Sequence, residues 1–398
     1  MPQVFALLIF FLLALDGFGV HFGREATITI VILIFPILFI HMLFRKRVLV
    51  FPKIASIFFL LYVSSTLIST AFSVDIIKSI QYSLISLSLF VAFLLSYNYK
   101  NELEKPITVI IFASSVLFSI YHLLLTFRVI NLFIPQHGYQ FVYSRYLTHN
   151  HLGDFLVLPI VISIFSLYNQ KRIILALTST FLFGILLLFA FSRSAYLSVA
   201  LTTLVMHLYS IKRMASHLQK KALRISVVSF LLFLFVLFIS TTQQATRHSL
   251  PSQIHSFLIK NVGLNPNKED TGRRPDYFLQ GLLSVQKSPL IGIGPDNFIY
   301  ASRANSADSN RDITLSAHNI LLEVLVGQGL LGAIPFFGLI AFFIIHSRKT
   351  ALFFAFLAML INFQTDYTYQ IYSFLLLFVV ILGTIVSKDH EITLNFKK

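Results

Sequence analysis

Two adjacent arginines, Arg273 and Arg274, stand directly before Pro275 in the second half of the chain. Proline suits a first helical position, and Phe278 and Leu282 follow at helical spacing. This pattern predicts a short amphipathic helix with two guanidinium groups at its N-terminus. Guanidinium groups and the free N–H groups of a helix N-terminus both suit an anionic phosphate group. An interfacial helix whose cations face lipid headgroups is an equally weighted alternative.

Further ionisable residues lie at the ends of long apolar runs: His149, His151, Asp154, Arg193, His318, Glu323 and Asp366. A charge inside or at the rim of a membrane segment is costly, and it indicates function by default. Each residue also has a plainer interpretation. Arg193 can snorkel to headgroups, and the histidines can serve as helix caps. Asp154 can form a structural ion pair with Arg145 or Arg193.

Several other kinds of chemistry are poorly supported by the sequence. His149, His151 and Asp154 offer three potential metal ligands, but residues i and i+2 of a helix do not share a face, so no metal is expected. The chain has no cysteine, which excludes a thiol nucleophile. The turn Gly292-Ile293-Gly294 is too short for a phosphate-binding loop, and it is interpreted as a bend. No cofactor is predicted.

The composition of the chain is that of a membrane protein. Of the 398 residues, 56% are hydrophobic and only 12% are charged, and the mean hydropathy is +0.80. A soluble enzyme would carry about twice that share of charge. The sequence therefore predicts an all-α polytopic membrane protein with about twelve spans. The predicted spans lie near 4–20, 26–44, 54–73, 76–97, 106–127, 148–168, 173–191, 195–211, 225–241, 318–346, 350–366 and 370–387.

The distribution of basic residues sets the predicted orientation. With both termini in the cytoplasm, the inner loops and tail hold 18 Lys and Arg residues and four acidic ones, against 13 and 12 on the other side. The net charge of +15 is therefore explained by membrane topology, and no nucleic acid partner is expected.

This orientation places every ionisable residue named above at the outer ends of the helices. It also divides the chain into a membrane region (1–241), one large outer loop with the amphipathic helix (242–317), and a second membrane region with the cytoplasmic tail (318–398). A loop of that length is usually functional. A shorter outer loop, 128–147, carries Arg145.

Five segments together resemble the O-antigen ligase and polymerase superfamily of bacterial envelope enzymes. They are Phe191-Ser192-Arg193-Ser194-Ala195-Tyr196-Leu197, Gly272-Arg273-Arg274, the run from Ser288 to Phe298, the run from Ala317 to Glu323, and the run from Gly327 to Gly332. Their order and spacing, with a large outer loop between late spans, are more specific than any one of them. The resemblance covers roughly 148–366.

The resemblance implies a GT-C-like membrane glycosyltransferase of the bacterial inner membrane. The ligase branch is similar to metal-independent, inverting enzymes that use a polyprenyl-pyrophosphate-linked glycan as donor. These enzymes transfer the glycan to a sugar hydroxyl of the lipid A-core at the periplasmic face. The implied partners are therefore this donor, the lipid A-core acceptor and membrane lipids.

The resemblance also implies roles for three residues. Arg193, His318 and Arg274 correspond to the family's functional positions, with Arg273 as the alternative loop arginine. Preorganised arginines would stabilise a leaving pyrophosphate without a divalent cation, and an imidazole is a suitable base for a hydroxyl. Asp154 and Glu323 are expected to orient these groups, and Glu323 is the alternative base.

A wider set of residues completes the predicted site. Residues expected to bind substrate are Arg273, Arg145, Asp154, His151, Glu323 and Asn319. Outer-rim tyrosines, among them Tyr139, Tyr143, Tyr277, Tyr367 and Tyr369, could stack on sugars or form an interfacial belt.

Two other functions remain open at this stage. An O-antigen polymerase would use the same donor and a growing chain as acceptor, but such enzymes often carry two substantial outer loops, and 128–147 is modest. A polyprenyl-lipid transporter belongs to a different class. It should place ionisable residues near the bilayer midplane and show related halves, and neither feature is evident.

Overall fold

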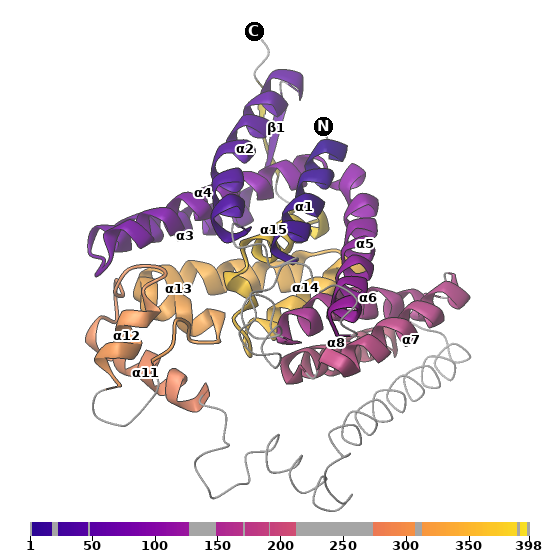
Figure 1. Ribbon diagram of the computed structural model, residues 1–398. Coiled ribbons are helices and arrows are strands. Elements are labelled where there is room, and N and C mark those ends of the chain that lie inside the picture. Colours follow the sequence, from indigo (N-terminus) through magenta and orange to yellow (C-terminus); the bar gives the residue numbers. More distant parts are fainter. Residues whose placement is uncertain are drawn as a thin grey trace, which may run out of the picture. The chain divides into compact units, whose positions relative to one another are not determined.

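The computed structural model describes residues 2–17, 23–46, 48–126, 149–169, 172–190, 192–211, 274–306, 313–387 and 391–395 (Figure 1). The helices are α1 (Pro2–Gly17), α2 (Gly23–Lys46), α3 (Lys53–Ala71), α4 (Ile76–Asn98), α5 (Lys100–Thr126), α6 (His149–Tyr168), α7 (Ile173–Ala190), α8 (Arg193–Ile211), α11 (Arg274–Lys287), α12 (Phe298–Ala304), α13 (Ile320–His346), α14 (Ala351–Asn362) and α15 (Tyr372–Ile385). A short 3₁₀ helix, η2 (Thr368–Gln370), and two strands, β1 (Val48–Pro52) and β2 (Glu391–Asn395), complete the described elements.

Eleven of the twelve predicted spans coincide with helices, namely α1 to α8 and α13 to α15. The predicted ninth span, at 225–241, lies outside the described residues. By length and composition, α2, α3, α4, α5 and α13 are long and apolar enough to cross a membrane, and α1, α6, α7, α14 and α15 are shorter apolar helices. The described part of the chain is thus mostly helical, as expected for an all-α polytopic membrane protein.

The chain divides into two compact units. The first consists of Met1–Ile110, Arg273–Phe353 and Phe363–Lys398, and the second of Ile111–Gly272 and Phe354–Asn362. The predicted boundaries after residues 241 and 317 separate membrane regions from the large outer loop. The two units do not show where the membrane lies, so these boundaries stay a prediction.

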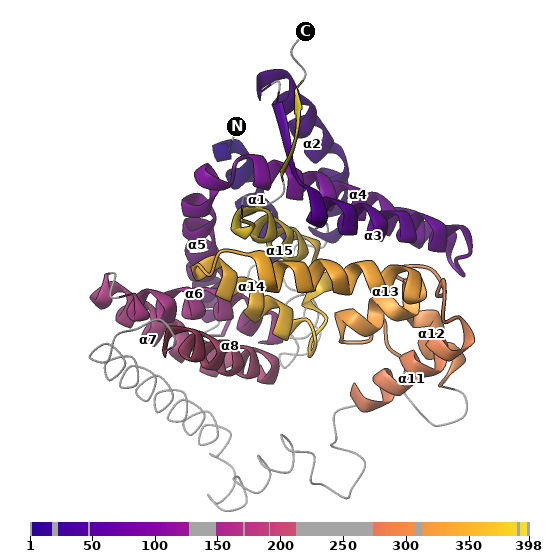
Figure 2. The same cartoon turned by 180° about the vertical axis from the view of Figure 1, so that it is seen from behind.

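In the second unit, α6 packs against both α7 and α8 (Figure 2). The first turn of α6 approaches the start of α8 closely because residue 153 is glycine. A Cβ at Gly153 would lie 2.5 Å from the Cβ of Ser192. Ser192 in turn caps α8, since its hydroxyl accepts the N–H of Ala195 at 3.3 Å.

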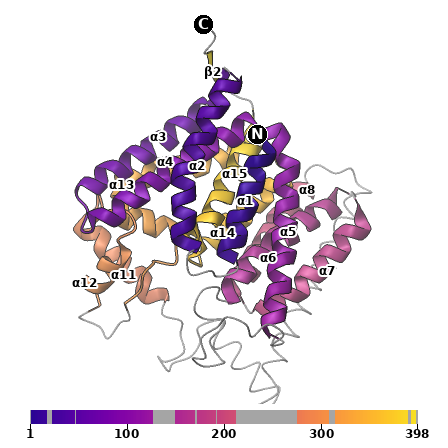
Figure 3. The ribbon, with the colours of Figure 1, turned by 45° about the horizontal axis from the view of Figure 1, so that its top comes forward.

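In the first unit, α13 packs on α3, and α15 packs on α4 (Figure 3). Aromatic rings fill the space between these helices. The centroids of Phe59 and Phe93 are 5.6 Å apart, and those of Phe93 and Phe343 are 5.9 Å apart. Each such pair contributes about 0.5–1.5 kcal/mol beyond its buried area.

One end of the first unit joins the loops that the charge distribution places in the cytoplasm. Strand β1 pairs antiparallel with β2, with Val50 opposite Thr393. Lys100 Nζ lies 3.5 Å from a carboxylate oxygen of Glu391. The sequence predicted no strand in the segment after α2 or in the tail, and this one pair of short strands adds to a fold that is otherwise helical in its described part.

The other end joins loops that are predicted to face outward. The N–H of Val74, between α3 and α4, donates to the carbonyl of Ile293 at 3.1 Å. The hydroxyl of Tyr300 on α12 donates to Asp75 at 2.9 Å. In the first unit, loops predicted to lie on the same side of the membrane are thus in contact with one another. Which end of the unit faces the cytoplasm stays a prediction.

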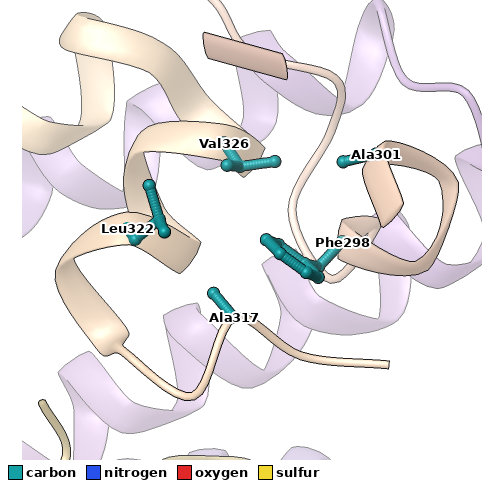
Figure 4. Close-up of a cluster of buried hydrophobic side chains, with 5 residues drawn as sticks. All are labelled: Phe298, Ala301, Ala317, Leu322 and Val326. Atoms are coloured by element: carbon teal, nitrogen blue, oxygen red, sulfur yellow. The ribbon is translucent and has the colours of Figure 1, made fainter. Parts of the chain in front are cut away.

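Helix α12 is held against the start of α13 by a small apolar cluster. Figure 4 shows its side chains: Phe298, Ala301, Ala317, Leu322 and Val326. All of them are nearly inaccessible to solvent. This cluster fixes the segment before α13, which contains His318, to the outer end of the first unit.

Helix α13 is broken at Gly329, whose φ of 60° and ψ of −159° lie in a region that is essentially restricted to glycine. The sequence predicted one continuous span here. The run from Ser288 to Pro295 lies along the break and satisfies its backbone groups. Gly294 N–H donates to the carbonyl of Gly327 at 2.9 Å, and Leu330 N–H donates to that of Pro289 at 2.8 Å.

The predicted bend at Gly292-Ile293-Gly294 is confirmed, since the φ angles of Gly292 and Gly294 are 76° and 98°. Only a residue without a Cβ adopts these angles readily. The glycines in the runs from Ser288 to Phe298 and from Gly327 to Gly332 therefore allow the first run to pack closely against the break in α13.

Gly329→Ala should destabilise the protein, by about 1–3 kcal/mol from backbone strain alone. A Cβ at Gly329 would also lie 2.4 Å from the carbonyl oxygen of Leu290. The expected result is a lower melting temperature of the detergent-purified protein. Gly184→Ala is the matched control, because its Cβ would meet nothing within 4 Å. Equal melting temperatures for the two variants would contradict the described packing.

Candidate active site

His318 lies in the segment that leads into α13. The predicted span 318–346 begins two residues before helix α13, which starts at Ile320 with Asn319 as its cap, so His318 precedes the helix. The side chain of Asn319 accepts the N–H of Leu322 at 2.9 Å and donates to the carbonyl of Gln364 at 3.1 Å. His318 has a φ of 53°, a left-handed conformation that is uncommon for a residue other than glycine.

The imidazole of His318 is enclosed by aromatic rings and faces a carboxylate. The ring of Tyr277 stacks on it with centroids 5.5 Å apart, and the ring of Tyr367 meets it edge-on at 4.8 Å. Its Nδ1 lies 3.9 Å from Oδ1 of Asp366. The side chain of His318 keeps 18% exposure, whereas that of Asp366 is fully buried. At 3.9 Å the carboxylate attracts the imidazolium form electrostatically, at a distance longer than a hydrogen bond.

Asp366 is the residue that sequence reasoning missed. The sequence places Asp366 in the predicted span 350–366, among the ionisable residues at the outer ends, and predicts no role for it. Helix α14 ends at Asn362, and Asp366 lies in the turn that follows. Its Oδ1 accepts the N–H of Tyr367 at 2.7 Å, which fixes the side chain within the turn. The only sequence signal was its position at the same predicted membrane face as His318.

Glu323 supports the backbone that presents His318. Its Oε2 accepts the N–H of Ala317 at 2.9 Å and the hydroxyl of Tyr369 at 3.0 Å. The hydroxyls of Ser316 and Tyr369 lie 2.7 Å apart and complete this network. The carboxylate therefore holds the residue before His318, as an orienting residue would. Tyr369 lies beside this carboxylate, and its role in sugar binding stays a prediction.

Glu323 and Tyr369 also border an internal cavity of about 60 Å³ in the first unit. Helices α3, α4, α13 and α15 supply a mainly apolar lining. The polar lining includes Tyr62 and Gln328, and the side-chain nitrogen of Gln328 donates to the hydroxyl of Tyr62 at 3.2 Å. This hydrogen bond joins α13 to α3 at the wall of the cavity.

Helix α11 connects the predicted loop arginine with His318. It begins at Arg274, so the prediction of a helix here is confirmed. Tyr277, which stacks on His318, follows Arg274 by one helical turn. The backbone of Arg274 is thereby held near His318. The side chain of Arg274 and all of Arg273 lie outside the described residues.

The second unit contains the other predicted arginine. Arg193 is the first residue of α8, and its side chain is not among those described. Next to it, the hydroxyl of Ser194 donates to Oδ1 of Asp154 at 3.4 Å. The amide of Asn362 donates to the same oxygen. Asp154, which is only 1% exposed, thus joins the ends of α6, α8 and α14 within this unit.

The remaining predicted site residues are described in part or not at all. His151 lies in the first turn of α6, without a described side chain. Arg145, Tyr139 and Tyr143 lie outside the described residues. The substrate-binding roles of His151, Asp154 and Arg145 stay predictions, and so does the convergence of Arg193 with Arg274 and His318.

The Glu323→Gln variant distinguishes between two roles of Glu323, that of a residue that orients His318 and that of the base. If Glu323 orients His318, the amide oxygen keeps part of the network, and kcat should fall by only about 10–10²-fold. A base replaced by glutamine would instead lose activity as completely as His318→Ala does. The measurement is kcat of the glycan transfer that the resemblance predicts, with the reconstituted protein. Glu102→Gln, an exposed carboxylate at the other end of the first unit, is the matched control and should leave kcat unchanged.

A family model described as O-antigen ligase matches residues 178–337, which include Arg193, both loop arginines and His318. No protein in the curated set matches the chain. Members of this family are membrane glycosyltransferase-like enzymes with lipid-linked glycan and lipid acceptor substrates, and the apolar helices agree with a multi-pass membrane protein. Residues 178–337 therefore match the O-antigen ligase family, which supports the predicted resemblance to the O-antigen ligase and polymerase superfamily.

Proposed function

We propose that the protein is an O-antigen ligase. In this proposal it transfers a glycan from a polyprenyl-pyrophosphate donor to a sugar hydroxyl of the lipid A-core, at the periplasmic face of the bacterial inner membrane. The observation that supports it best is the pairing of His318 with Asp366 beside helix α11, which begins at Arg274. The arrangement puts an imidazole that can act as a base beside a helix whose first residue is an arginine.

The reaction follows from these side chains. The acceptor hydroxyl attacks the anomeric carbon of the donor, and the bond from that carbon to the pyrophosphate oxygen breaks. His318 takes the hydroxyl proton, and the buried carboxylate of Asp366 stabilises the imidazolium that forms. Arg193 and Arg274 stabilise the charge that develops on the leaving pyrophosphate. Attack opposite the leaving group inverts the anomeric configuration.

In this mechanism two guanidinium groups provide the positive charge that a divalent cation provides in many glycosyltransferases. Transfer should therefore persist in the presence of a chelator such as EDTA. The measurement is the rate of glycan transfer by purified protein in vesicles, with and without the chelator. A loss of activity that added Mg²⁺ restores would contradict the metal-independent mechanism.

A polymerase is the second candidate, and a polyprenyl-lipid transporter is a third from a different class. The most direct test is reconstitution with a polyprenyl-pyrophosphate-linked glycan and a lipid A-core acceptor. A ligase forms the glycan–core product. A polymerase extends the lipid-linked glycan without using the core acceptor, and a transporter moves the donor across the bilayer without forming a glycosidic bond.

A further inference from the structure

Helix α11 has an unusual distribution of side chains. The side that packs on the protein buries the small or polar residues Gln280, Gly281 and Ser284, and Val285 is the apolar residue of α11 that packs against the cluster around Phe298. The opposite side carries large apolar residues. Phe278 is 46% exposed, Leu279 is 39% exposed and Leu282 is 41% exposed. A helix on a water-facing surface has the reverse pattern, with its apolar side against the core.

The buried side cannot be turned outward at low cost. The hydroxyl of Ser302 on α12 donates to the side-chain oxygen of Gln280 at 2.8 Å. The side chain of Asn305 donates to the backbone carbonyl of Gln280 at 3.2 Å. A Cβ at Gly281 would lie 2.8 Å from a methyl carbon of Leu322, so α11 fits closely against α13 only in this orientation. Phe278, Leu279 and Leu282 are therefore held on the outward side.

This outward side is close to the place where a candidate span begins. Helix α11 packs on the first segment of α13, and Leu322 is the third residue of that helix (Figure 1). The nearby connecting segments also expose apolar side chains, with Leu290 and Leu315 each 66% exposed. Exposed apolar side chains thus lie on α11 and on both segments that connect it to α13, a helix that is long and apolar enough to cross a membrane.

We propose that α11 is inserted into the outer leaflet of the bilayer, with Phe278, Leu279 and Leu282 in contact with lipid acyl chains. The occupant of this apolar surface is phospholipid. Insertion removes these three apolar side chains from water, where their exposure is unfavourable. The polar side of the helix stays against the protein.

Insertion has a consequence that rests on the proposed function. Arg274 begins α11, and Tyr277 contacts His318 from the protein-facing side. A helix seated at a fixed depth would therefore hold the arginine and the histidine at the level of the headgroups. The diphosphate of a lipid-linked donor lies at this same level.

The chain has no tryptophan, so a single introduced tryptophan reports on one position without background. We would make Phe278→Trp and Leu282→Trp in the full chain and reconstitute each variant into phosphatidylcholine vesicles with brominated acyl chains. Both tryptophans should lose about half of their fluorescence to bromines placed about 5–10 Å below the headgroups. Leu60→Trp, on the exposed side of α3, is the membrane control and should be quenched most by deep bromines. Arg303→Trp, on the exposed side of α12, is the water control and should not be quenched.

Two results would overturn the proposal. Emission from both α11 variants at the wavelength of Arg303→Trp, without quenching, would mean that this side of the helix faces water. Blue-shifted emission without quenching would mean that a second copy or another protein covers it. Because fluorescence reports position and not catalysis, either result would leave the ligase function untouched. A failure of the transfer assay would in turn leave the quenching result intact.

Discussion

His318→Ala should reduce kcat for glycan transfer by about 10²–10⁴-fold, which is the usual contribution of a positioned general base. The variant should still insert into the membrane and accumulate, because His318 lies outside the helices, where its side chain contacts the first turn of α11 and the turn at Asp366. The measurement is kcat at saturating donor and acceptor in reconstituted vesicles. His41→Ala, an exposed histidine of α2, is the matched control and should transfer at the normal rate.

Asp366→Asn tests whether the carboxylate acts through His318. An amide cannot stabilise the imidazolium as a carboxylate does, so kcat should fall by about 10²-fold or more, with little change in KM. The pH dependence of kcat should also change, which a purely structural defect would not produce.

Full activity in His318→Ala would show that the histidine is not the base, and Glu323 would then be the alternative base.

Arg193→Ala and Arg274→Ala should each lower kcat by about 10²–10³-fold, or about 3–4 kcal/mol of transition-state stabilisation. The reason is that the charge on the leaving pyrophosphate is greatest in the transition state. Arg→Lys variants keep the charge but lose the bidentate geometry, so each should retain an intermediate activity. The measurement is again kcat with saturating donor, with Arg303→Ala, an exposed arginine of α12, as the control.

The same series decides between the two loop arginines. If Arg274 is the phosphate ligand, Arg273→Ala should lose much less activity than Arg274→Ala. The opposite ranking would assign the role to Arg273. Normal kcat with a raised KM in every arginine variant would mean that these residues bind donor equally in the ground state and the transition state.

The helices of this protein are predictable from the sequence because their signal is local. A span requires about twenty apolar residues in succession, and α4 and α6 lie close to the predicted ranges 76–97 and 148–168. The start of α11 was also predictable, because Pro275 and the apolar spacing after it are local signals. The apolar residues of this helix were expected, but the side on which they lie relative to the protein was not.

The features that were not predicted depend on residues far apart in the chain. His318 and Asp366 are brought together by the turn after α14, and no periodicity links them. Strands β1 and β2 lie in a short loop and in the tail, and each gains a partner only when the helices pack. The break at Gly329 was hidden within a continuous apolar run, because only the docked segment from Ser288 to Pro295 makes it favourable. Tyr277 was predicted as a tyrosine that could stack on sugars, and its contact with His318 required the placement of α11.

The central claim is that Arg193 and Arg274 converge with His318 on one pyrophosphate. An experimentally determined structure of the full chain with a bound polyprenyl-pyrophosphate would test it most directly. The expected result is that the guanidinium groups of Arg193 and Arg274 donate hydrogen bonds to the pyrophosphate, with the imidazole of His318 within reach of the anomeric position. A pyrophosphate bound without either arginine, or arginines on separate surfaces of the protein, would contradict the proposed mechanism.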